Sequence, residues 1–128
     1  MNDAEKKAIA EQFLTGLHNR NWESLRAIMA DDIVWSLPGG SVISGRAKGI
    51  DAVIKRAQTI VSYGLTFTLQ HILIGQDGVA LSLHNTAQHG ELVLDEYLAT
   101  VFGLRDGKIS AIDGYLSDVS LVNVFFVK

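Results

Sequence analysis

Three residues, Glu96, His84 and His71, have side chains of the type and position that suit proton-transfer chemistry. Glu96 alternates with Leu94 and Leu98, so all three share one face if this segment is a strand. Removing a carboxylate from water disfavours its charged form, which suits such a group to general acid or base work near neutral pH. We therefore interpret Glu96 as a catalytic candidate. The alternative is that a bulge turns it toward solvent.

The two histidines leave more than one interpretation open. His71 falls on the apolar face of the alternating segment 65–73, where it can donate to a ligand, pair with Glu96, or bond a backbone carbonyl as a core residue. His84 shares a polar face with Ser82, and a period of two does not reveal which face points inward. Both histidines are candidates for proton transfer beside the glutamate.

Several other chemistries are excluded by what the sequence lacks. The chain has no cysteine, which rules out disulfides, thiolate nucleophiles and cysteine zinc sites. The histidines and Glu96 have no metal-ligand spacing, and there is no phosphate loop or Gly-x-Ser-x-Gly elbow. We therefore expect no metal and no cofactor. The net charge is −3 and the basic residues are scattered, so we expect no nucleic-acid partner.

The bulk composition is typical of one packed domain over residues 1–128. Hydrophobic residues make up 48% and charged residues 20%, so a real core is expected. No apolar run approaches the ~18 residues of a membrane helix, and the first residues lack the apolar stretch of a signal peptide. We expect a cytoplasmic protein without a membrane partner.

Periodicity predicts helices in the first half of the chain and strands in the second. Asn2 with Glu5 forms a capping box for the first helix, and Asn21 can cap a short second one. We expect Asp31 and Asp32 to end that second helix. The remaining elements are a strand over 33–37, a third helix over 50–61, and strands over 65–73, 79–88, 92–104 and 109–118. The apolar tail at 121–127 is predicted to be a further strand or an interface segment.

Helices followed by an antiparallel meander predict an α+β fold, in which a curved sheet wraps against three helices to form a cone. The interior of such a cone is apolar and is a natural pocket for a small ligand. One face of the sheet must then be covered by something other than these helices. We expect a homodimer for that reason, with Asp95, Tyr97, Asp113 and Tyr115 on the outer face.

Several strings in the sequence resemble one superfamily in their order and spacing. They are Asn21–Leu25 leading to 29–32, Trp35–Gly39, the glycines at 45 and 49, and 106–109 followed by 114–119. Together they are similar to the SnoaL-like and ketosteroid isomerase-like proteins, which share the nuclear transport factor 2-like (cystatin-like) α+β roll. The resemblance implies that Glu96 faces the cone interior. It also implies that the pocket is shaped by Phe13, Trp35, Leu37, Leu98, Thr100, Ile112 and Leu116.

The same resemblance argues against two known chemistries of the fold. A ketosteroid isomerase would carry its carboxylate base at Leu37, its tyrosine at Phe13 and its second acid near Thr100 (or Ala99). All of these positions lack the required group. A limonene-type epoxide hydrolase would need an Arg-x-Asp pair on the strand at 82–86 and an aspartate at Gly114, and neither is present.

Three functions remain, and each predicts a different interior. A SnoaL-like enzyme would isomerise, cyclise or hydrate a small apolar substrate without a cofactor, in a cavity with at least two convergent titratable groups. A binding protein would have an enclosed but chemically inert cavity. A dimeric interaction module would have a filled cone and an exposed apolar patch. We favour the enzyme, because a carboxylate is costly to keep in an apolar interior without a use.

Overall fold

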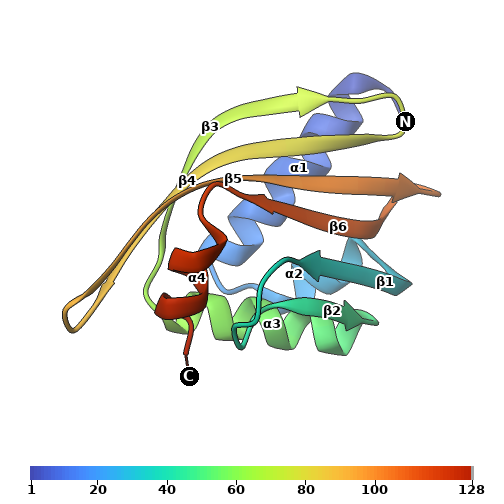
Figure 1. Cartoon of the computed structure of the whole chain (residues 1–128). Helices are drawn as coiled ribbons and strands as arrows, with labels where there is room; N and C mark the ends of the chain where they lie inside the picture. The colour runs from blue at the N-terminus through green and yellow to red at the C-terminus, as the bar shows by residue number, and fades with distance from the viewer. Residues whose placement is uncertain (128) are drawn as a thin grey trace.

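The computed structural model describes residues 1–127, which form a curved sheet with four helices (Figure 1). The elements run along the chain in the order helix, helix, strand, strand, helix, four strands, helix. The helices are α1 (Asp3–His18), α2 (Trp22–Ala27), α3 (Ile50–Ser62) and α4 (Val119–Phe125), and the strands are β1 (Met29–Leu37), β2 (Gly45–Lys48), β3 (Thr66–Ile74), β4 (Gly78–His89), β5 (Leu92–Arg105) and β6 (Lys108–Leu116).

The first two helices begin where their capping residues predict. The Asn2 side chain accepts a hydrogen bond from the Glu5 N–H, and the Glu5 side chain accepts from the Asn2 N–H, which completes the capping box of α1. Asn21 accepts from the Ser24 N–H at the start of α2. These bonds satisfy N–H groups that have no partner inside the helix, so the local sequence fixes where each helix starts.

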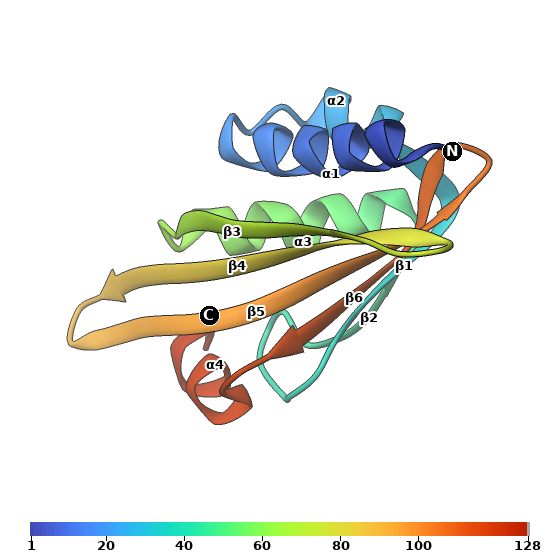
Figure 2. The ribbon, with the colours of Figure 1, turned by 90° about the horizontal axis from the view of Figure 1, so that it is seen from above.

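The sheet has the strand order β2-β1-β6-β5-β4-β3. Long antiparallel ladders join β3 to β4, β4 to β5, and β5 to β6, as the alternating pattern predicts. The pairing of β1 with β6 is parallel, so the sheet is mixed and not purely antiparallel. Figure 2 shows α1, α2 and α3 together on one side of the strands, and the sheet curves toward them. The predicted α+β roll is confirmed.

Two sequence predictions about element boundaries are wrong. Asp31 and Asp32 do not end a helix but lie inside β1, which starts at Met29. The register of β1 against β6 is irregular between Met29 and Val34, and this lets both aspartates point to solvent. The tail over 121–127 is not a strand: α4 occupies most of it, and the Asp118 side chain caps that helix by accepting from the Leu121 N–H.

The core lies between the concave face of the sheet and the helices. Phe13 of α1 packs edge-on against Trp35 of β1 and against Phe102 of β5, with ring centroids 6.2 and 4.8 Å apart. Helix α4 follows the end of β6 (Figure 1), and Phe126, the residue after α4, packs against Tyr63, the residue after α3. Among residues 1–127 no helix is both long and apolar enough to cross a membrane.

Candidate functional site

A cavity of about 60 Å³ lies between the helices and the concave face of the sheet. A water molecule needs ~10–15 Å³ by this kind of measure, so the cavity has room for a few waters and its walls must yield to anything larger. Its wall is almost entirely apolar and comes from every layer of the fold. The lining residues are Phe13, Leu14, Leu17, Trp35, Leu37, Pro38, Ile43, Ser44, Ile60, Leu65, Phe67, Leu83, Asn85, Leu94, Glu96, Leu98, Thr100, Leu116, Val122 and Phe126.

Glu96 lies in this wall and is 2% exposed. Its Oε1 accepts hydrogen bonds from the backbone N–H groups of Ser117 (2.6 Å) and Asp118 (3.2 Å). Its Oε2 is buried and has no hydrogen-bond partner among the described residues. One oxygen therefore fixes the carboxylate in place, and the other remains available to a bound molecule.

Asn85 is a second polar residue of the wall, and the sequence analysis did not single it out. It is 7% exposed and lies directly opposite Glu96 across the β4–β5 ladder. Its Oδ1 is also buried without a partner in the described part of the chain. The signal was present in the sequence, because Asn85 alternates with Leu81 and Leu83 and so had to share their face. Asn85 and Glu96 are therefore neighbours on the buried face of the sheet.

Most of the residues predicted to shape the pocket lie in its wall. Phe13, Trp35, Leu37, Leu98, Thr100 and Leu116 all line the cavity. Ile112 does not, because it is fully buried in the core at the level of Phe102. Gly114, at the level of Thr100, leaves space that Leu37 fills: a Cβ there would lie 2.2 Å from Leu37 Cδ2.

Trp35 is held in the wall by an arginine that lies behind it. Arg56 donates from Nη1 to the Trp35 carbonyl (2.7 Å) and from Nη2 to the Ser44 carbonyl (3.1 Å). Its guanidinium carbon also lies 5.7 Å from the centre of the Trp35 ring, within cation–π range. Burial lowers the pKa of Arg56. The Trp35 Nε1 is buried with no acceptor within the described residues.

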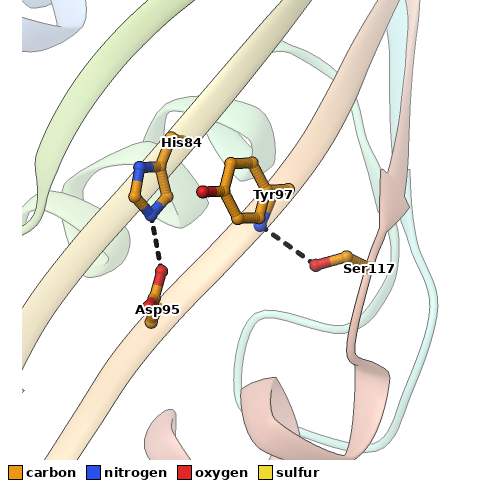
Figure 3. Close-up of polar contacts among 4 residues, drawn as sticks. All are labelled: His84, Asp95, Tyr97 and Ser117. Atoms are coloured by element: carbon orange, nitrogen blue, oxygen red, sulfur yellow. Dashed lines mark hydrogen bonds and ion pairs between the residues drawn. The ribbon is translucent and has the colours of Figure 1, made fainter.

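His84 lies on the outer face of the sheet, away from the cavity (Figure 3). Its Nε2 lies 2.5 Å from Asp95 Oδ1, and its ring stacks on Tyr97 with centroids 4.2 Å apart and planes 6° from parallel. The sequence left the direction of His84 open, and the structure places the leucines of β4 inside. His84 therefore has no contact with the cavity wall.

His71 also lies outside, and here the predicted face is wrong. Leu69 pairs with Leu83 but His71 pairs with Ser82, so β3 contains one extra residue between them. This bulge reverses the alternation, and His71 is exposed on the outer face while Ile72 takes the inner position. Neither histidine joins Glu96. Within residues 1–127 the cavity wall holds one ionisable side chain, not the two that an enzyme was expected to show.

Helix α4 and the residue after it form one part of the cavity wall. Val122 and Phe126 form part of the wall, and Glu96 holds the turn at Ser117 and Asp118 from which the helix starts. Further along, the Asn123 side chain accepts from the Gly40 N–H at 2.8 Å. A helix this short is marginal on its own, so these contacts and the packing of its phenylalanines keep it in place.

The sequence matches the SnoaL-like domain over residues 10–112, and the chain belongs to this family. The match spans most of the sheet and three of the four helices. It ends inside β6 and does not reach α4. No curated protein matches the sequence.

Solved structures share the fold at low sequence identity. Bal32a, from a soil-derived mobile gene cassette, is 22% identical, with 96% of this chain and 97% of that chain covered at a TM-score of 0.90. A cystatin-like protein of unknown function from Xanthomonas campestris is also 22% identical, with both chains fully covered at a TM-score of 0.85. A putative ketosteroid isomerase from Kribbella flavida DSM 17836 is 21% identical, with 90% and 79% covered at a TM-score of 0.74. These likenesses establish the fold.

Proposed function

We propose that this chain binds a small, largely apolar molecule in the cavity and moves a proton within it, with Glu96 as the acid–base group. One observation carries the proposal: a carboxylate that is 2% exposed keeps Oε2 without a hydrogen-bond partner among the described residues. Leaving a buried acceptor unpaired costs about 1–3 kcal/mol, more for a charged group. A bound molecule that contacts Oε2 offsets this cost.

Among the described residues the wall holds one ionisable group, which favours an isomerase-like reaction over hydrolysis. A single carboxylate can take a proton from one atom of a substrate and return it to another atom of the same molecule. The bonding electrons shift along the substrate, and no second reactant is consumed. Epoxide opening by water requires a base for the water and an acid for the epoxide oxygen, which is one group more than the wall holds.

Binding without chemistry is the second candidate function. Its support is that Phe13, Leu37 and Thr100 occupy the pocket positions at which the family resemblance expects the groups of a steroid isomerase. The apolar wall would then select the ligand, and Glu96 with Asn85 would only orient it.

Proton exchange at carbon tests the two candidates. We would follow deuterium uptake from D2O into the carbon positions of two aryl ketones that also carry a hydroxyl, 2-hydroxyacetophenone and 1-hydroxy-3-phenylpropan-2-one, by NMR, with the wild type, Glu96→Gln and Asp95→Asn. Asp95 is the matched control, because it neighbours Glu96 on the same strand but points to the outer face. We expect the wild type and Asp95→Asn to accelerate exchange, and Glu96→Gln to be slower by about 10²–10⁴-fold.

Two other results would decide against the enzyme. Equal rates of deuterium exchange for the wild type and Glu96→Gln would mean that Glu96 is not the acid–base group. Binding of both compounds without any acceleration, seen as shifts of the Ser117 and Asp118 amides, would leave the binding function.

A further inference from the structure

We infer that the ligand presents a hydrogen-bond donor, a hydroxyl or an amine, to Asn85 and Glu96, and that the site rejects carboxylates. The inference rests on the proposed function, because it names the ligand class of the same cavity. It starts from two atoms that are buried and without a partner in the described chain, Asn85 Oδ1 and Glu96 Oε2. Both are acceptors when Glu96 is a carboxylate.

The two side chains stand together. Asn85 pairs with Glu96 in the β4–β5 register, so their Cβ atoms are neighbours on the inner face, about 4.5–5.5 Å apart in this geometry. Phe67 follows in the same row on β3, and Leu94 and Leu98 flank Glu96 along β5. The nearest strand neighbours of the pair are thus apolar, and a donor on the ligand is the group that both oxygens lack.

The charge of the wall also disfavours a ligand that carries a carboxylate. Among the lining residues of the described chain there is one carboxylate and no lysine, arginine or histidine. Lys6 and Arg56, two cations of the described residues that reach toward the interior, are already committed elsewhere. Lys6 donates to the Gly75 and Gln76 carbonyls at 2.8 and 2.9 Å, and Arg56 donates to the carbonyls of Trp35 and Ser44. A ligand carboxylate would meet Glu96 with no counter-charge, which disfavours its entry.

A series of compounds with one ring and one changed group tests this inference. We would titrate toluene, benzyl alcohol, benzaldehyde, benzylamine and benzoate into the protein, and follow the amide shifts of Ser117 and Asp118. These amides donate to Glu96 Oε1, so they report on its immediate surroundings. We expect benzyl alcohol and benzylamine to bind about tenfold more tightly than toluene and benzaldehyde, and benzoate not to bind.

Three variants assign the effect to the pair. Glu96→Gln keeps the shape but removes the carboxylate, so benzylamine, which is a cation near neutral pH, is expected to lose more affinity than benzyl alcohol. Asn85→Leu removes the second acceptor, so the affinities of benzyl alcohol and benzylamine are expected to fall toward the affinity of toluene. Asp95→Asn, on the opposite face, is expected to leave the whole series unchanged.

The outcomes separate the ligand class from the proposed function. If benzaldehyde binds as tightly as benzyl alcohol, or benzoate shifts the same amides, the inferred ligand class is wrong while the cavity remains a binding site. If none of the five compounds shifts these amides, both the inferred ligand class and the proposed function are wrong.

Discussion

Replacing Asn85 with leucine is expected to stabilise the protein even though it damages the site. The asparagine is 7% exposed, and its Oδ1 is buried with no hydrogen-bond partner among the described residues. An unpaired buried polar group costs about 1–3 kcal/mol. Leucine also branches at Cγ and can extend its methyl groups into the adjacent cavity. We therefore expect the free energy of unfolding to rise by about 1–3 kcal/mol.

Urea unfolding followed by far-UV circular dichroism measures this change. The midpoint is expected to move to higher urea with an unchanged slope, because the surface exposed on unfolding stays nearly the same. Thr86→Leu is the control, since Thr86 is the next residue on the outer face, and its effect is expected to stay within about 0.5 kcal/mol. A less stable Asn85→Leu would mean that the amide is already satisfied in the free protein. It would refute the reasoning that a ligand completes this pair.

Three further predictions concern the rest of the fold. The hydrogen bond from Arg105, together with its charge, lowers the pKa of Asp32, so Arg105→Gln is expected to raise that pKa toward its ordinary value in a carboxyl NMR titration. A carboxyl group whose pKa is lowered in the folded state stabilises the fold at pH values above its unfolded-state pKa, and this contribution is lost as the pH falls through its folded-state pKa. The variant lacks the contribution, so it should lose less stability in acid. An unmoved pKa would contradict this. Gly114→Ala is expected to lower the free energy of unfolding by about 1–3 kcal/mol, because the new Cβ overlaps Leu37, and unchanged urea unfolding would show that the leucine can move aside. Tyr115 is 64% exposed on the uncovered outer face, so we expect a homodimer through this face that Tyr115→Arg dissociates; a wild type of monomer mass by light scattering would exclude it.

The sequence predicted the elements better than their pairing. Capping residues and periodicity located α1, α2 and α3, and the turns located the three antiparallel ladders. The parallel pairing of β1 with β6 was not predicted, because it joins segments more than 70 residues apart and leaves no local signal. The strand alternative for the apolar tail at 121–127 was also wrong, because α4 occupies most of it. Short apolar runs fit a strand or a buried helix equally well, and tertiary packing decides between them.

Strand alternation succeeded for Glu96 and failed for His71 for one physical reason. The ladder of β4 with β5 is regular from Gly78 to His89, so every second residue keeps its face. The bulge in β3 breaks that parity one residue before His71. No residue type marks the bulge, so the sequence could not place this histidine. The same alternation could have predicted the position of Asn85, because it places Asn85 on the same face of β4 as the inward-pointing leucines.

The position of the pair explains why a familiar mechanism does not transfer to this chain. The two carboxyl groups of a steroid isomerase would sit in the row of the sheet that contains Leu37, Gly114 and Thr100. Glu96 lies four residues before Thr100 on β5, which corresponds to about 13 Å at the usual rise of a strand. Its row adjoins the start of α4, where the backbone N–H groups of the turn fix Oε1. A substrate that reacts with Glu96 must therefore place its reactive group at the α4 end of the cavity and its apolar body toward the deep, aromatic end.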